Sequence, residues 1–147
     1  MKFTTAAISS ILAATALAAP MPAAEKSAMA DVAQWTIESM QRVCDSGDTQ
    51  CTWSFRVNTH TSDPTPCTFT VKGSPASQTD SSGNICGPYT VGSGWSGQFG
   101  PGNGFTTLSV VDYAAKLIVW PAYTDKQLAN GQVVTPDLSY APTVLNF

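Results

Sequence analysis

The side chains that could catalyse a reaction are few and lie far apart in this sequence. His60 is the only histidine, and a hydrolytic triad would have to recruit it from the turn-like segment THTSDP. Ser96 stands in GWSGQ, which lacks the second glycine of the GxSxG turn that exposes a nucleophilic serine. Asp112 lies in the apolar run VVDY, where a salt bridge or a turn at the strand end explains it more simply than catalysis. We therefore expect no enzymatic activity.

Paired carboxylates and cofactor motifs are equally sparse. A glycosidase needs two carboxyl groups about 5 to 10 Å apart, but Glu25 and Glu38 are the only glutamates and the aspartates lie mostly in turns. The stretch GSGWSG, starting at Gly92, matches the dinucleotide-binding pattern GxGxxG, but the following QFGP cannot begin the helix that this motif requires. With one histidine and no CxxC pair, zinc is disfavoured. We expect neither a metal nor a cofactor.

The most distinctive segment combines glycines with aromatic residues: GWSGQFGPGNGF, from Gly94 to Phe105. Its glycines either place the rings on an exposed loop or allow tight turns while the rings fill the core. Loops on a rigid scaffold commonly carry recognition, and large aromatic side chains anchor binding partners. The candidate recognition loop therefore consists of Trp95, Gln98, Phe99, Asn103 and Phe105.

The start of the chain predicts secretion. Lys2 precedes the apolar stretch AAISSILAATALAA, which ends in a small-residue cleavage pattern. This stretch is shorter than the roughly 20 residues that cross a bilayer as a helix, although a retained anchor is the alternative. We interpret residues 1–18 as a signal peptide, 19–31 as a flexible leader and 32–147 as a single extracellular β domain.

Four cysteines could hold this domain together by two disulfides, which is the usual state outside the cell. Four cysteines allow three pairings. We favour Cys44–Cys51 and Cys67–Cys86, because each pair closes a local loop between predicted strands. In the chain-entropy model such loops contribute about 2.5 and about 3.3 kcal/mol.

Alternation of apolar and polar residues predicts an all-β domain. It is clearest in CTWSFRV, where every second residue is apolar, and the turn-forming DSGDTQ before it favours a hairpin. Residues 74–84 read as a polar loop and residues 125–130 as a helical turn. The fold class is a compact antiparallel β-barrel or sandwich with about seven short strands. The predicted strands are 34–43, 51–57, 67–72, 89–96, 105–113, 116–123 and 132–135.

The residue pattern of the first hairpin predicts an irregularity in its strand register. If the first two cysteines face each other, an unbroken register turns Trp35 and Ile37 outward, away from the core. One extra residue in a strand flips every side chain before it. We therefore predict a bulge near Ser39, which returns both side chains to the core and leaves Arg42 over the ring of Trp53 as a cation–π pair.

The charge balance limits the partners. The chain has seven basic and ten acidic residues, and only 12% of its residues are charged. Such a surface offers no electrostatic footprint for phosphate backbones or anionic membranes. We expect no nucleic-acid binding and no membrane insertion.

Several segments resemble known secreted fungal proteins. QWTIESMQRVC, CTWSFRV and CTFTV, within residues 33–72, are similar to the opening strands of the Alternaria major allergen family. GWSGQFGPGNGFTTLSVVDY and IVWPAYTDKQL resemble fungal hypersensitive-response-inducing protein elicitors, over most of the chain but with less specific motifs. The resemblance implies a compact β-barrel or sandwich that is released into plant tissue, triggers cell death and defence, and uses no cofactor or catalytic machinery. Unlike allergen-type members, this chain has all its cysteines within residues 44–86.

These observations predict a secreted fungal elicitor or effector that induces plant cell death and defence by surface recognition. Its expected partner is a plant cell-surface receptor or cell-wall component, and the chain itself is expected to be a monomer or weak homodimer. Two alternatives stay open. One is a cell-wall carbohydrate-binding module that uses Trp95, Phe99 and Phe105, and the other is a small secreted hydrolase that uses His60 or Asp112.

Overall fold

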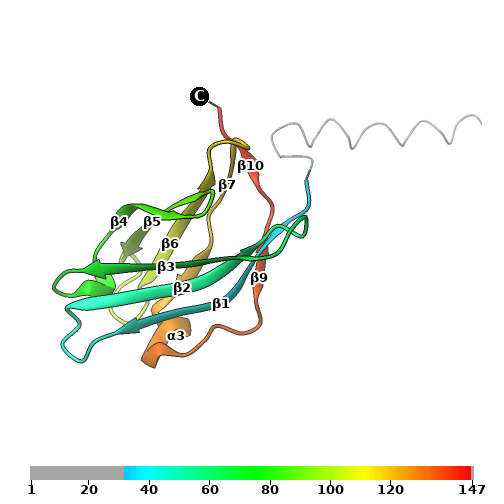
Figure 1. Cartoon of the computed structure of the whole chain (residues 1–147). Coiled ribbons are helices and arrows are strands. Elements are labelled where there is room, and N and C mark those ends of the chain that lie inside the picture. Colours follow the sequence, from blue (N-terminus) through cyan, green and yellow to red (C-terminus); the bar gives the residue numbers. More distant parts are fainter. Residues whose placement is uncertain (1–31, 147) are drawn as a thin grey trace, which may run out of the picture.

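The computed structural model describes residues 32–146, and the predicted signal peptide and leader lie outside the described residues. Figure 1 shows the strands in two layers, with β1, β2 and β3 in front of β4 to β7. The elements are β1 (Trp35–Cys44), β2 (Gln50–Asn58), β3 (Thr65–Lys72), η1 (Ala76–Gln78), β4 (Ser81–Cys86), β5 (Tyr89–Ser96), β6 (Phe105–Asp112), β7 (Leu117–Val119), β8 (Ala122–Thr124), α3 (Asp125–Leu128), η2 (Ala129–Gly131), β9 (Leu138–Tyr140) and β10 (Thr143–Val144).

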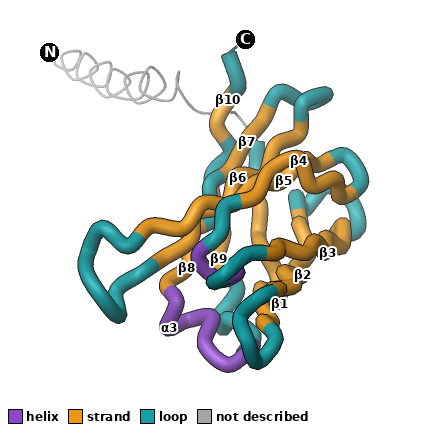
Figure 2. Tube along the Cα trace, turned by 90° about the vertical axis from the view of Figure 1, so that its left-hand side faces the viewer, coloured by secondary structure: helices purple, strands orange, loops and turns teal. Residues whose placement is uncertain are grey.

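The two layers are separate antiparallel sheets. The first has the order β3-β2-β1-β9 and the second the order β10-β7-β6-β5-β4, while β8 pairs with the other end of β6. Figure 2 shows the same arrangement from the side, with α3 directly after β8. The all-β antiparallel prediction is confirmed in its sandwich-like form. The described residues form ten strands instead of about seven, and the sheets do not close into a barrel.

Three local predictions were wrong. β4 lies largely inside the predicted polar loop 74–84, because an edge strand needs no apolar alternation to pair with β5. The predicted strand 116–123 breaks at Pro121 into β7 and β8, since proline has no N–H to donate to a neighbouring strand. Residues 132–135 form no strand, and the last two strands, β9 and β10, follow them. The helical turn at 125–130 is confirmed as α3 and η2.

The predicted bulge in β1 is confirmed. The register between β1 and β2 shifts between Glu38 and Gln41, and Ser39 takes a left-handed φ of 54°. As a result Trp35 and Ile37 are both buried in the core. Arg42 is 8% exposed, and its guanidinium carbon lies 5.7 Å from the centre of the Trp53 ring, as the cation–π prediction requires.

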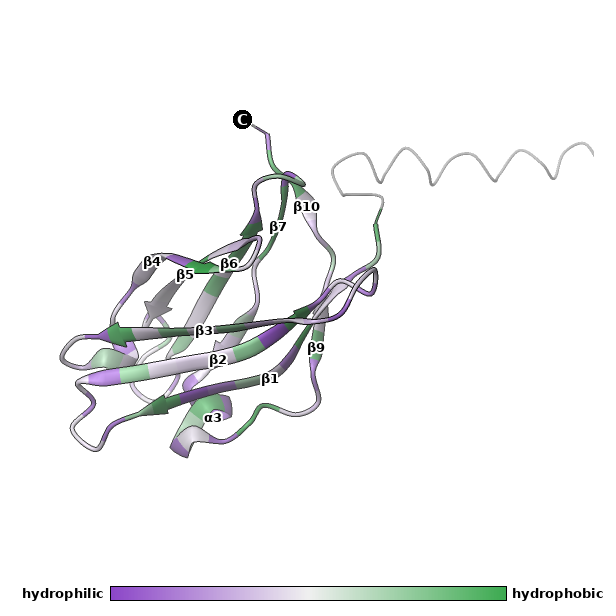
Figure 3. Cartoon of the chain, viewed as in Figure 1, coloured by the Kyte–Doolittle hydropathy of each residue, from purple (hydrophilic) through white to green (hydrophobic). Residues whose placement is uncertain are grey.

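The core fills the space between the sheets. Figure 3 shows apolar and polar residues following one another along β1 and β2, so that one face of each strand is apolar. Both predicted disulfides are present: Cys44–Cys51 closes the first hairpin, and Cys67–Cys86 joins β3 of one sheet to β4 of the other. No helix in the described residues is long and apolar enough to cross a membrane. The buried cluster includes Trp35, Ile37, Met40, Trp53, Phe55, Val57, Phe69, Val71, Tyr89, Val91, Leu108, Val110, Val119, Tyr123 and Leu128.

Candidate functional site

The glycine-rich loop of residues 97–104 joins β5 to β6 at the end of their ladder. Two successive turns shape it, because Gly100 donates its backbone N–H to Gly97 O over 3.0 Å and Asn103 donates to Gly100 O over 3.1 Å. Gly100 and Gly102 have φ values of 95° and 80°, which side-chain-bearing residues rarely adopt. The loop is therefore held by its own hydrogen bonds and projects beyond the paired strands.

Trp95 anchors the base of this loop. Its indole Nε1 donates to Asp125 Oδ2 over 2.9 Å, and its backbone N–H donates to Asp80 Oδ1 over 3.0 Å. The ring also packs against Gly97 and Gly104, where an added Cβ would lie 2.5 Å and 2.7 Å from ring carbons. The half-buried indole is therefore held in place and does not stand free in solvent.

The other candidate residues gather on the outer side of the loop. Phe99 is 65% exposed, and its ring stacks on that of Phe105 with centroids 5.7 Å apart and planes inclined by 28°. Gln98 and Asn103 are exposed, and the Asn103 amide donates to Phe99 O over 3.3 Å. The structure thus places an exposed aromatic pair on a loop whose conformation is fixed from within.

An apolar groove of about 320 Å³ runs beside this aromatic pair. Tyr123 forms its floor and is almost fully buried, which raises the pKa of its phenol above the ordinary value of 10.0. The residues contributed by β8 and α3 were missed by sequence reasoning, because only the pairing of β8 with β6 brings them beside the loop. The groove is lined by Phe99, Asn103, Phe105, Ala122, Tyr123, Thr124 and Gln127.

A second, polar cleft lies near Arg42, at the end of β1. The Arg42 Nη1 donates to Asp125 Oδ1 over 3.3 Å and to Ser77 O over 3.4 Å. Because Asp125 also accepts from Trp95, one carboxylate connects β1 of the first sheet with β5 of the second. The sequence predicted the packing of Arg42 on Trp53, but it carried no signal for Asp125 as the shared partner.

The residues considered for catalysis form hydrogen bonds within the protein. His60, on the turn after β2, shares a hydrogen bond of 2.8 Å between its Nε2 and Thr36 Oγ1. Asp112 ends β6 and accepts from the Ala115 N–H over 3.0 Å, which is the strand-end turn expected from its position. Ser96 Oγ accepts from the backbone of the loop. His60 follows β2 of the first sheet and Asp112 ends β6 of the second, so the fold does not assemble them from neighbouring strands.

One group among the described residues has the spacing of metal ligands: Cys44, Asp48 and Cys51. Its two sulfur atoms are bonded to each other in a disulfide, so they supply no thiolate to an ion. The group is therefore a structural element of the first hairpin.

The comparisons with known proteins agree on one family. A family model described as Effector TSP1 matches residues 36–146, which include every strand of the second sheet and nearly all of the first. A curated relative from Hypocrea virens (strain Gv29-8 / FGSC 10586), named Effector TSP1, is 53% identical over 147 residues, covering 99% of each chain. The match is to a fungal effector family and does not extend to the allergen or to hypersensitive-response elicitors. This chain belongs to the Effector TSP1 family.

Proposed function

We propose that this protein is a secreted effector that contacts plant tissue through the loop of residues 97–104 and induces cell death and defence without catalysis. Membership of an effector family supports the general role. The predicted signal peptide and the two disulfides support action outside the cell. The exposed Phe99 is the observation that carries the proposed mode of contact.

Phe99 has the properties of a binding anchor. The Phe99 ring is 65% exposed. A partner that covers it removes apolar surface from water, which favours binding. Its stacking on Phe105 and the turns of the loop hold it in place before binding, which lowers the entropy lost on association. The adjoining groove gives a partner side chain an apolar surface to fill. The partner is a plant surface receptor or a cell-wall component with a complementary apolar group.

The loop suits a protein partner better than a flat sugar platform. Trp95, the largest ring of the segment, is half-buried and its indole N–H is bonded to Asp125, so it is less open to a partner than Phe99. Phe99 and Phe105 stack on each other instead of lying side by side in one plane. We therefore keep the receptor as the leading partner and the cell-wall polymer as the second.

The test compares Phe99→Ala with Ile85→Ala, because both side chains are large, apolar and exposed, at 65% and 70%, but Ile85 lies on edge strand β4. Each protein is secreted from an expression host, purified from the medium and infiltrated into leaves of several hosts. Loss of an anchor worth about 1.4 kcal/mol raises the dose for necrosis about tenfold in Phe99→Ala only. Full activity of Phe99→Ala, or no response to the wild-type protein in any host, contradicts the proposal.

A second pair of variants separates recognition from catalysis. His60→Gln and Asp112→Asn remove the two groups on which a hydrolase would depend, and each wild-type side chain is exposed or half-buried and bonded to one neighbouring residue. We expect both variants to keep the wild-type leaf response. Loss of the response in a variant that melts at the wild-type temperature would favour the hydrolase instead.

A further inference from the structure

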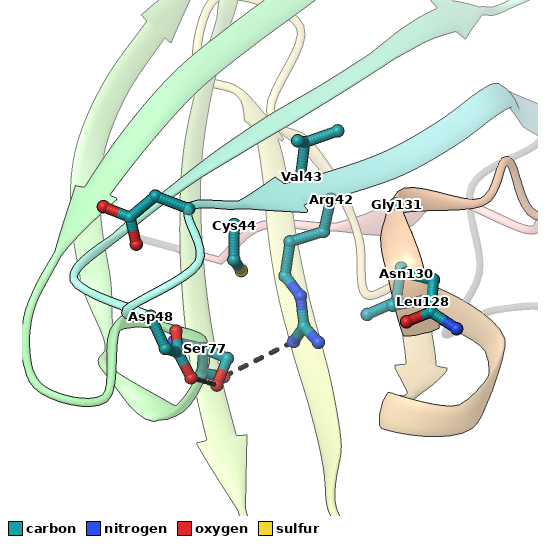
Figure 4. Close-up of a pocket in the computed structure, with 9 residues that line it drawn as sticks. Arg42, Val43, Cys44, Asp48, Ser77, Leu128, Asn130 and Gly131 are labelled. Carbon is teal, nitrogen blue, oxygen red and sulfur yellow. Dashed lines mark hydrogen bonds between the residues drawn. The ribbon is translucent and has the colours of Figure 1, made fainter.

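The polar cleft near Arg42 is not used by the proposed recognition loop. Its volume of about 490 Å³ lies within the range of small-molecule sites. Four segments form its walls: the end of β1, the turn after it, η1, and the α3–η2 segment (Figure 4). The lining residues are Arg42, Val43, Cys44, Asp45, Asp48, Ser77, Leu128, Asn130 and Gly131.

Arg42 has hydrogen-bonding capacity that the protein leaves unused. A guanidinium carries five N–H donors, but the bonds to Ser77 and Asp125 both use Nη1 and are long, at 3.4 Å and 3.3 Å. The buried Nε has no partner within the protein. Figure 4 shows the guanidinium between Ser77 on one side and Leu128 and Asn130 on the other, inside the cleft. Because this Nε is enclosed by the protein, a ligand in the cleft would accept from Nη2, which neither of the two bonds uses.

The opposite wall offers acceptors. Asp48 is half-buried and accepts from both the backbone and the hydroxyl of Ser77. Asp45 accepts from Thr49, and these bonds hold the pKa of the Asp45 carboxyl below its ordinary value of 3.8, so it is ionised at neutral pH. Asp45 and Asp48 both line the cleft, and Asp125 pairs with Arg42, so three carboxylates stand against one guanidinium in this region. This excess of negative charge disfavours an anionic ligand.

The walls also disfavour an extended peptide. A peptide that adds to a sheet needs a free strand edge. Beside the cleft, η2 covers the edge of β1: a Cβ added to Gly131 would lie 3.3 Å from Val43 Cγ2 and 4.0 Å from Arg42 O. Gly131 O also accepts from the Gln41 amide over 2.7 Å, which holds η2 in this position. A compact ligand fits this geometry better than a strand.

We propose that this cleft binds a neutral carbohydrate, with adjacent sugar hydroxyl groups accepting from Arg42 and donating to Asp45 and Asp48. A hydroxyl group both donates and accepts a hydrogen bond. Two neighbouring hydroxyl groups can therefore pair with the Arg42 donors on one side and the aspartate acceptors on the other, without adding charge. The exposed Asn130 amide supplies a further donor and acceptor at the rim. The proposal does not rest on the aromatic loop, because the cleft lies on the other side of Asp125.

The test titrates the protein purified from culture medium with soluble neutral oligosaccharides derived from glucan, xylan, mannan and chitin. Oligogalacturonides form the anionic arm, and a panel of short peptides forms the third. Backbone NMR shifts report both affinity and location. We expect a neutral oligosaccharide to bind below about 10 mM, with shifts confined to residues 42–48, 77 and 128–131.

The decisive variant is Asn130→Gly, because glycine keeps the left-handed φ of 59° at this position and removes only the amide. Asn146→Gly is the matched control, with the same change near the C-terminus, far from the first hairpin in Figure 1. We expect Asn130→Gly to weaken binding about three- to tenfold, the loss of one neutral hydrogen bond, and Asn146→Gly to leave it unchanged. Arg42→Gln should abolish binding, but it removes a buried group, so its melting temperature is measured alongside.

Three results of the titration would overturn the proposal. No neutral oligosaccharide binds at about 10 mM, or binding maps to the aromatic groove instead of the cleft, or only the oligogalacturonides or the peptides bind. An unchanged affinity in Asn130→Gly, or in an Arg42→Gln protein that melts at the wild-type temperature, would likewise contradict the site.

Discussion

Gly104→Ala tests how tightly the base of the recognition loop is packed. The new Cβ would lie 2.5 Å from Asp125 Oδ2, 2.7 Å from Trp95 Cζ2 and 2.8 Å from Trp95 Nε1, so the indole and the carboxylate must separate. A hydrogen bond to a charged acceptor is worth about 1.5–3 kcal/mol, and forcing a methyl group into a packed site costs about 1–3 kcal/mol. Because one displacement causes both losses, we expect a net destabilisation of about 2–4 kcal/mol.

The measurement is thermal and urea unfolding of the purified protein. For a domain of this size about 1 kcal/mol corresponds to roughly 4 °C, so the melting temperature should fall by about 8–16 °C. Gly94→Ala is the control on neighbouring strand β5, because its Cβ would meet only Asp80 Oδ1 at an ordinary 3.8 Å. That variant should stay within about 0.5 kcal/mol of the wild type or gain slightly from reduced chain entropy.

A double-mutant cycle identifies the cause. Trp95→Phe removes the two indole atoms that the new Cβ would meet, so Gly104→Ala should cost clearly less in that background. If Gly104→Ala melts within about 2 °C of the wild type, or costs the same in both backgrounds, then the Trp95–Asp125 contact does not hold the loop in the way argued above.

Two further predictions concern β1. Glu38→Gln removes a carboxylate whose pKa is lowered from 4.5 by hydrogen bonds from Asn58 and Arg56. A pKa that is lower in the folded than in the unfolded protein stabilises the fold at any pH above the unfolded pKa. The wild type should therefore have a higher urea midpoint than the variant at pH 7, and this difference should shrink as the pH falls below 4.5. A difference in midpoint that is constant with pH would contradict this. At Ser39, which has a φ of 54°, glycine should be neutral or stabilising and valine should cost about 1–2 kcal/mol in urea unfolding, whereas equal midpoints for both would argue against the bulge.

The first half of the fold could be predicted because its signals are local. The alternation around Trp53, the turn after Cys44 and the cysteine pairing together determine one register, and that register requires the bulge at Ser39. β4 could not be found in this way. It is an edge strand whose one large apolar residue, Ile85, points into solvent, and Cys86 is its only buried residue, so it shows no alternating pattern.

The candidate site was predictable in composition but not in the role of each residue. The glycine pattern allowed either exposed rings or rings packed in the core, and the structure contains both, with Phe99 65% exposed and Trp95 half-buried. The role of Trp95 depends on Asp125, which is 30 residues away in the sequence and is positioned by the capping box of Thr124 and Gln127 at the start of α3. Such a contact arises from tertiary packing, and no spacing rule within a strand or loop can report it.

The positions of the two disulfides have a consequence for survival among extracellular proteases. Cys44–Cys51 encloses the turn after β1, and Cys67–Cys86 encloses the segment that contains η1. A cut in either enclosed segment breaks a peptide bond but leaves both pieces covalently joined, with their strands still paired in the sheets. A protease can therefore cleave the chain in either of these two segments without releasing a fragment.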